Sequence, residues 1–197
     1  TDNTVFGFLA GAAGLSGGTD NVLIGDYAGN AMTSADGNVA IGGESMLEHT
    51  TGGQNVCIGD NTMKGTNAHA NSLASSHNVF VGYNSGSGTW GVGETKENVC
   101  LGSGTMQNVV NAAESNVCIG YVAGKDITGG NFNILIGRLA GGEIEDANNT
   151  IFIGQGAGDA VTVTNSGNSD GTIGIGLNAL GALTSGASNL AVGYLAG

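Results

Sequence analysis

Short apolar runs that end in glycine recur along the whole chain. Each run follows an Asn or a Thr, as in Asn116-Val-Cys-Ile-Gly120. The eleven closing glycines are Gly7, Gly25, Gly42, Gly59, Gly82, Gly102, Gly120, Gly137, Gly154, Gly176 and Gly193. Their spacing is nearly constant except for three longer intervals, which follow Gly59, Gly82 and Gly154. A repeated unit of about 17 residues, with three insertions, therefore organises the chain.

The three residues before each glycine predict a β-strand. The first and third, Val117 and Ile119 in one copy, are aliphatic in nearly every copy, and in a strand they face the same side. The middle residue faces the other side and is never polar, which favours a strand covered on both faces.

Fixed positions around the strand predict a tight corner. The closing glycine is expected to have a positive φ, or to lie where no Cβ fits. Three residues later the chain always has Ala, Ser or Thr, which indicates close approach of another chain segment. Two interpretations fit the Asn four residues before the glycine: a turn cap through its side chain, or an amide ladder between stacked copies.

A second short strand is predicted in the remainder of several units. The apolar-Thr pairs that indicate it are Met32-Thr33, Ile127-Thr128, Val163-Thr164 and Leu183-Thr184. One strand, a corner, a second strand and a return make one coil of a parallel β-solenoid. No segment keeps a helical period, so residues 1–197 are predicted to form a single all-β repeat domain of about eleven 17-residue coils.

A coil this thin leaves one apolar strand face in water, which marks an interface. Several identical chains around a shared axis would bury that face; three is an economical number for a fibre, although composition does not fix it. We expect Ile119 to be buried and Arg138 to lie outside. The middle strand residues expected in the core or at the chain–chain interface include Cys57, Phe80, Cys100, Cys118 and Phe152.

The three cysteines fit no zinc motif, because no two of them have the close spacing that such a motif requires. Cys100 and Cys118 are expected on adjacent coils, within reach of a disulfide by distance. Their parallel side chains favour the other interpretation, in which all three are reduced packing residues.

Composition narrows the class of protein. The chain has 39 Gly and no Pro, and 4 basic residues face 16 acidic ones, for a net charge of −12. A collagen helix requires Pro and a period of three, and disorder requires fewer apolar residues than the 40% present. No apolar run is long enough to span a membrane. A surface this acidic repels phosphate backbones, so nucleic acid is not an expected partner.

The insertions are the expected contact loops, since a solenoid accommodates added residues where they loop away from the stack. They lie near 64–77, 87–97 and 159–171. His69, His77 and Trp90 are the candidate receptor contacts within them. Trp90 has an equally good alternative, packing onto its own coil.

No catalytic, cofactor-binding or metal site is predicted. The acidic residues Glu143, Glu145 and Asp146 lack the spacing of a calcium loop and are interpreted as a solvated turn. Asp26 and Asp60 share a register position two coils apart, the one arrangement suggestive of a polysaccharide-cleaving enzyme. A non-enzymatic chain is the favoured interpretation.

The repeat resembles two known families. The unit Asn116-Val-Cys-Ile-Gly-Tyr-Val-Ala-Gly124 is similar to the head repeats of YadA-type trimeric autotransporter adhesins. It resembles more closely the Gly-Tyr-x-Ala-Gly-rich repeats of bacteriophage tail fibres. This resemblance implies a left-handed, homotrimeric parallel β-roll. The 17-residue unit is longer than that of the adhesin heads, which favours the phage fibre.

The resemblance also implies a function. It indicates a non-enzymatic structural component of a virion tail or attachment fibre, which serves in host adhesion or as a rigid spacer. Its expected partners are itself, other fibre or virion proteins, and a cell-surface glycan or protein receptor. The alternative is the head domain of a trimeric adhesin on a bacterial surface.

Overall fold

The computed structural model describes residues 2–66, 74–108, 110–160 and 169–197. It contains eleven strands of three residues each. They are β1 (Thr4–Phe6), β2 (Val22–Ile24), β3 (Val39–Ile41), β4 (Val56–Ile58), β5 (Val79–Val81), β6 (Val99–Leu101), β7 (Val117–Ile119), β8 (Ile134–Ile136), β9 (Ile151–Ile153), β10 (Ile173–Ile175) and β11 (Leu190–Val192).

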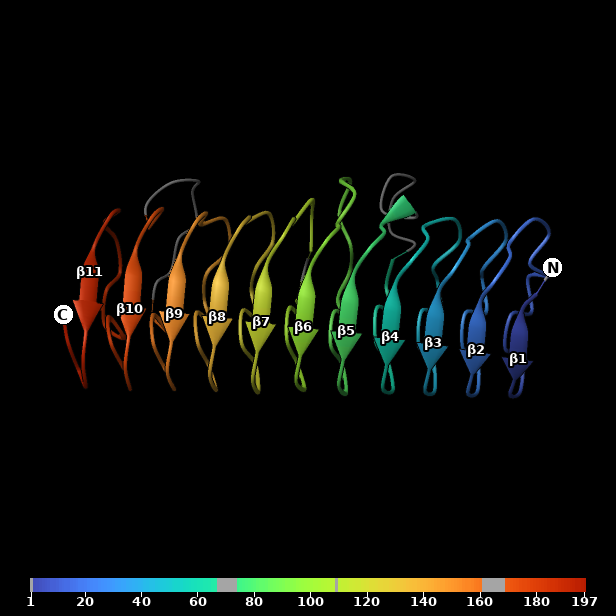
Figure 1. Ribbon diagram of the computed structural model, residues 1–197, viewed down its shortest axis with the longest axis horizontal. Coiled ribbons are helices and arrows are strands. Elements are labelled where there is room, and N and C mark those ends of the chain that lie inside the picture. Colours follow the sequence, from blue (N-terminus) through green and yellow to red (C-terminus); the bar gives the residue numbers. More distant parts are fainter. Residues whose placement is uncertain (1, 67–73, 109, 161–168) are drawn as a thin grey trace.

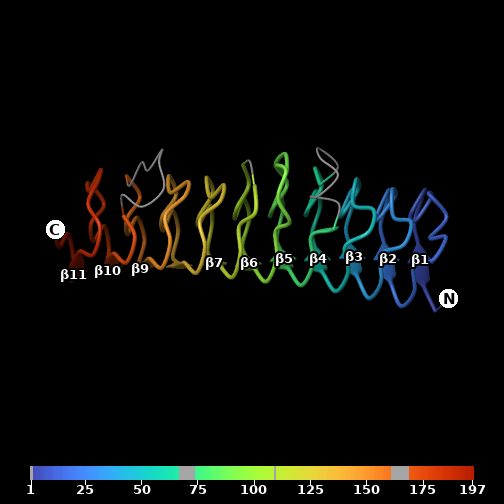
Figure 2. The same ribbon diagram turned by 90° about the horizontal axis from the view of Figure 1, so that it is seen from above.

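The strands form one parallel sheet in sequence order, β1 to β11. Equivalent residues pair across every step, as Val117 does with Ile134 and Cys118 with Leu135. Figure 1 shows this row of strands, and Figure 2 shows that the strands lie along one side of the rod while the return segments lie along the other. The prediction of an all-β parallel solenoid is confirmed, with almost no helix among the described residues.

The middle residue of each strand from β2 to β11 points into the coil and is buried. The flanking residues point outward and are half-buried or exposed, as in Val117–Ile119. This alternation follows from the two-residue period of a strand. Ile119, expected to be buried, is therefore only half-buried in the single chain, whereas Arg138 is exposed as expected. The eleven-strand sheet thus lies between a core on one side and open surface on the other.

The core is one side chain wide. Two inward-facing positions, the middle strand residue and the residue four positions after the closing glycine, compensate one another in size in most coils. Where the middle strand residue is large, as Leu135 is, the residue four positions after the closing glycine is glycine, here Gly141. A Cβ at Gly141 would lie 2.8 Å from Leu135 Cδ2. Where the middle residue is small, as Ala40 and Cys57 are, that later position holds Met46 or Met63, both fully buried. Most coils therefore fill a similar volume with a different pair, as dense packing requires. The coil of Cys118 is an exception, because its later position is Gly124, and Ile127 and Leu135 pack there instead.

A ladder of buried asparagines runs beside the core. Asn116 donates from its backbone N–H and its Nδ2 to Asn98 Oδ1, both at 3.0 Å, and Asn133 does the same to Asn116 Oδ1. Each Nδ2 also donates to a carbonyl at the end of its own coil, as Asn116 does to Gly130 O at 2.8 Å. Of the two interpretations of this position, the structure shows the amide ladder. Thr150 ends the continuous run and donates from its Oγ1 to Asn133 Oδ1 at 2.7 Å.

The closing glycines stack in contact with one another. A Cβ added to Gly120 would lie 2.6 Å from Gly137 O, and its φ is +131°. Both parts of the sequence prediction hold at this corner, since φ is positive and no side chain fits. Gly193, at the end of the stack, has the same backbone conformation, with a φ of +129°, but its Cβ would meet only Ala196 Cβ, at 3.9 Å.

Each coil turns through left-handed backbone at three recurring positions. They lie five residues before, two after and four after the closing glycine. In the coil of Gly120 they are Ser115, Val122 and Gly124, with φ of 58°, 61° and 57°. Side chains cost roughly 1–2 kcal/mol in this region, yet several coils place Leu, Met or Val there.

The prediction of a second strand is wrong at the sites that the structure describes. Met32-Thr33, Ile127-Thr128 and Leu183-Thr184 lie in turns and irregular backbone, and Val163-Thr164 falls outside the described residues. These segments do hydrogen-bond to the next coil, as Thr128 N does to Glu145 O at 2.9 Å. The left-handed residues nearby keep the contact from extending into a strand ladder.

Candidate interaction surfaces

The outward residues of the sheet form a continuous apolar surface, which we call the apolar stripe. It consists of the first and third residues of β2 to β11, and all of them are Val, Ile or Leu. Ile58, Leu101, Ile134 and Ile175 are each about 37–38% exposed although they lie inside the stack. Nine steps of about 4.8 Å and a width of about 10 Å give a flat area on the order of 400 Å².

Two columns of different chemistry border the apolar stripe. One lies five residues before each closing glycine and is mostly polar: Asp20, Gly37, Gln54, His77, Glu97, Ser115, Phe132, Asn149, Gly171 and Ser188. The other directly follows each closing glycine, and we call it the corner column: Phe8, Asp26, Gly43, Asp60, Tyr83, Ser103, Tyr121, Arg138, Gln155, Leu177 and Tyr194. The abrupt change from aliphatic to mixed polar residues gives the apolar stripe defined edges.

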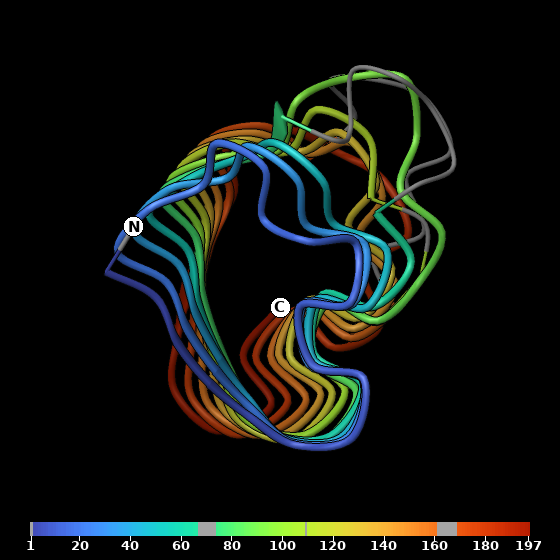
Figure 3. The same cartoon turned by 90° about the vertical axis from the view of Figure 1, so that its right-hand side faces the viewer.

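Segments of three neighbouring coils, the first two of which carry an insertion, pair with one another. Isolated parallel bridges join Gly65 to Thr89, Trp90 to Val110, and Lys96 to both Ser76 and Glu114. In the end-on view of Figure 3, the green segment after β5 projects from one corner of the coil.

The structure corrects the assignment of Trp90 as a receptor contact. Its side chain is fully buried. The indole packs edge-on against Phe80, with ring centroids 5.9 Å apart, and Nε1 donates to Gly86 O at 2.9 Å. Gly86 leaves room for the Phe80 ring, and the insertion brings Trp90 over it as part of the core. The alternative interpretation of Trp90 is the one that the structure shows.

The two candidate histidines differ in what the structure describes. His69 lies outside the described residues. His77 is exposed, borders the apolar stripe, and contacts Ser76 Oγ through Nδ1 at 3.1 Å. His49, which was not a candidate contact, is fully buried, and its Nε2 lies 2.9 Å from Gly52 O. Burial lowers the pKa of His49 to about 4.

The cysteines are free and belong to the core of the chain. Cys57, Cys100 and Cys118 are fully buried, as are Phe80 and Phe152. They therefore do not form the outward surface. Cys57 Sγ contacts Met63 Sδ at 3.3 Å, and burial raises the pKa of both Cys57 and Cys100. All three thiols are free and packed in the core, as the favoured interpretation of the cysteines requires.

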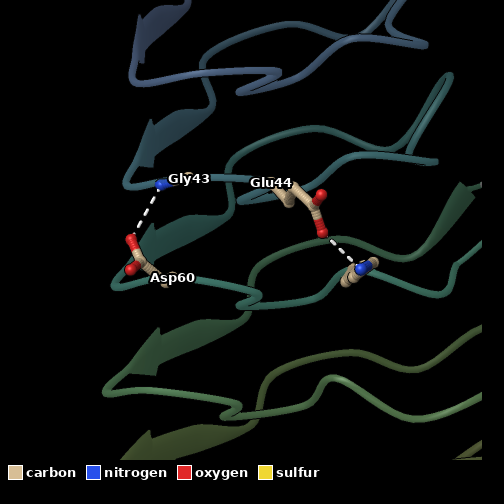
Figure 4. A network of polar contacts seen from close by, with 4 residues as sticks. Gly43, Glu44 and Asp60 are labelled. Carbon is tan, nitrogen blue, oxygen red and sulfur yellow. Dashed lines mark hydrogen bonds and ion pairs between the residues drawn. The ribbon is translucent and has the colours of Figure 1, made fainter.

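The acidic pair suggestive of an enzyme lines a shallow hollow of about 390 Å³. The hollow forms where the corner column contains Gly43 between Asp26 and Asp60, and Tyr27, Glu44 and Asn61 complete its walls. Asp60 accepts a hydrogen bond from Gly43 N at 2.8 Å, and Glu44 forms an ion pair with Lys64 (Figure 4). Of the three carboxylates that line the hollow, Glu44 and Asp60 thus join neighbouring coils.

The acidic residues 143, 145 and 146 do not converge on a common point. Glu143 is exposed, and Asp146 Oδ1 accepts from Thr128 Oγ1 at 2.7 Å and from Gly129 N at 3.1 Å. Across the described parts of the chain, no three His, Cys, Asp or Glu side chains are grouped as metal ligands. Asp146 serves as an inter-coil hydrogen-bond acceptor.

The sequence reasoning missed the exposed aromatic residues of the corner column. Tyr83, Tyr121 and Tyr194 are 57%, 56% and 71% exposed, and all three directly follow a closing glycine. The signal was available, because the position after each glycine is readable once the repeats are aligned. The strand and the insertions account for most of the pattern, so this column is less conspicuous in the sequence.

Within the described ranges, no helix has the length and apolarity needed to cross a membrane. The chain matches no protein-family model, no curated protein and no solved structure.

Proposed function

We propose that the chain is a rigid, non-enzymatic segment of a viral attachment fibre, associated as a homotrimer through the apolar stripe. The apolar stripe is the observation that carries the proposal. The largest contiguous apolar patch on a typical monomer is about 300–600 Å² and often serves as an interaction site. Here a surface of that size is flat and straight, and none of its side chains is charged over ten strands.

Rigidity supports the role in a fibre. Every coil is hydrogen-bonded to the next through the strands and the corner segments, for example Gly137 N to Ile119 O at 2.8 Å. The asparagine ladder adds further bonds between the coils as far as Thr150. The chain contains no Pro to interrupt these contacts. A rod of this kind holds other parts of a virion at a fixed distance and transmits force along its axis. The resemblance to tail-fibre repeats favours this role over the alternative, an adhesin head on a bacterial surface.

The apolar stripe can be tested by placing charge on it. Ile58→Asp combined with Ile119→Asp puts two carboxylates on the outer side of β4 and β7. Buried against another chain without partners, each would cost several kcal/mol. We expect this variant to retain an all-β circular dichroism spectrum but to sediment as a monomer, whereas the unaltered chain sediments with the mass of three chains.

A matched control adds the same charge elsewhere. Ser34→Asp with Thr89→Asp changes two exposed residues outside the stripe, and its trimer should persist. A monomeric unaltered chain, or an Ile58→Asp/Ile119→Asp trimer as stable as the control, would contradict the proposal.

A further inference from the structure

Four consecutive residues of the corner column form a ridge of two tyrosines beside the apolar stripe. Tyr83 and Tyr121 are both more than half exposed. Their strands, β5 and β7, are separated by one strand, so the two side chains start about 10 Å apart. Ser103 lies between them, and the Arg138 guanidinium carbon is 6.0 Å from the Tyr121 ring centroid. We call Tyr83, Ser103, Tyr121 and Arg138 the tyrosine ridge.

The backbone holds the two rings at a fixed separation. Each ridge residue directly follows a closing glycine, and backbone hydrogen bonds tie these corners together. Gly104 N donates to Tyr83 O at 3.0 Å, Val122 N to Ser103 O at 2.9 Å, and Leu139 N to Tyr121 O at 3.0 Å. A tyrosine has few rotatable bonds, so a ligand that contacts both rings orders little additional side chain.

The chemistry of the tyrosine ridge suits a neutral sugar chain. A pyranose ring has an apolar face of C–H groups that packs on an aromatic ring, and hydroxyl groups at its edge. Tyr rings offer both an apolar face and a polar hydroxyl. Ser103 and Arg138 add a small hydroxyl and a set of N–H donors beside the rings. The separation of the two rings is close to the length of a disaccharide, so alternate sugars of one chain would reach both.

Other partners fit the tyrosine ridge less well. A second copy of the chain would favour a continuous apolar column, but the corner column also contains Asp26, Asp60 and Gln155. Nucleic acid is repelled by a net charge of −12. The same charge disfavours anionic polysaccharides, which leaves neutral ones.

We propose that the tyrosine ridge binds a neutral polysaccharide by stacking alternate sugars on Tyr83 and Tyr121. This inference rests on the proposed attachment fibre and names the class of ligand that this part of it contacts. Tyr194 provides an internal comparison. It occupies the same column and is even more exposed, but the residue two coils before it in the column is Gln155, so it forms no pair.

The experiment is native affinity electrophoresis of the trimer in gels that contain dextran, glycogen or galactomannan as probes. Tyr83→Ala with Tyr121→Ala is the test variant, Tyr83→Phe with Tyr121→Phe keeps the rings, and Tyr194→Ala is the matched control. We expect at least one probe to retard the unaltered chain, the Phe variant and the control. The Ala variant should require at least about tenfold more polysaccharide for equal retardation, as expected for two lost stacking contacts.

Two results would overturn the inference. One is that none of the probes retards the unaltered chain, or that the Ala variant is retarded equally. The other is that the Ala variant loses its trimeric mass, because the tyrosines would then be contacts between chains. The sedimentation mass of the unaltered chain tests the proposed fibre assembly separately. A trimer that none of the three polysaccharides retards would therefore refute only the sugar site.

Discussion

Adding one methyl group to the glycine column at Gly120 should destabilise the stack by about 4 kcal/mol. The Cβ of Gly120→Ala would lie 2.6 Å from Gly137 O, where ordinary contacts begin near 3.4 Å, so the next coil must retreat by about 0.8 Å. The bond from Gly137 N to Ile119 O would stretch from 2.8 Å to about 3.6 Å, beyond the hydrogen-bonding range. The bond from Leu139 N to Tyr121 O lies at the same corner and would weaken as well.

Each such hydrogen bond contributes about 1 kcal/mol net, and the unfavourable φ adds about 2 kcal/mol. Two controls separate these effects. Gly193 has nearly the same φ, but no following coil lies against it. Gly193→Ala should therefore lower the free energy of unfolding only by the cost of the backbone conformation, about 2 kcal/mol. Gly37 lies within the stack at a φ of +67°, and a Cβ there would make only an ordinary contact, with Gln54 Cγ at 3.6 Å. Gly37→Ala should therefore lower the free energy of unfolding by about 1 kcal/mol.

The assay is urea unfolding followed by far-ultraviolet circular dichroism, at one protein concentration because the proposed association of chains would contribute to stability. With an m value of about 2 kcal/mol per molar urea, the midpoint should fall by about 2 M for Gly120→Ala and by about 1 M or less for the controls. Equal shifts for Gly120→Ala and Gly193→Ala would show that backbone conformation alone requires glycine, and the steric account of the column would be refuted.

Two further predictions concern the core. Gly141→Met alone should destabilise the protein because its Cβ would meet Ile144 Cδ1 at 2.7 Å and Leu135 Cδ2 at 2.8 Å, whereas adding Leu135→Ala removes the second contact and restores the Ala/Met combination of Ala40 and Met46. The double variant should be at least about 1 kcal/mol more stable in urea than the sum of the single variants predicts, and strict additivity would contradict the compensation. For His49, the folded-state pKa of about 4 lies below the ordinary 6.5, so the unfolded chain binds the proton more readily. Stability should therefore fall as the pH decreases from about 6.5 to 4, by up to about 3 kcal/mol. His49→Met should remove that part of the pH dependence, and an unchanged pH profile would show that other groups cause it.

The strand and its corner could be predicted from the sequence because the same few positions meet in every coil. Each closing glycine contacts the next, as Gly120 does Gly137, so the restriction acts on every copy and becomes visible as a pattern. The asparagine column was predicted only to within two alternatives. A cap and a ladder require the same residue, and only the spacing of the coils decides between them.

The return segments could not be predicted in the same way. Met32 and Ile127 have the composition of a strand, but the left-handed residues of their coils direct the backbone elsewhere. Trp90 was ambiguous because its place depends on how the insertion folds back. Gly86 leaves room for the Phe80 ring, and its carbonyl accepts the hydrogen bond from the indole N–H. The corner tyrosines were visible in the aligned sequence, and only their exposure required the structure.

The recurring left-handed residues have a consequence for how the rod forms. No coil is favoured by its own local sequence, because residues such as Val122 and Leu139 adopt that backbone against their intrinsic preference. A coil becomes favourable only when a completed neighbour offers it hydrogen bonds, so the first coil is a costly nucleus and later coils add by templating. Contacts between successive coils span only about 17 residues of sequence, and short loops of this kind close rapidly. Once nucleated, the solenoid should therefore grow quickly from coil to adjacent coil, each new turn copying the shape of its completed neighbour.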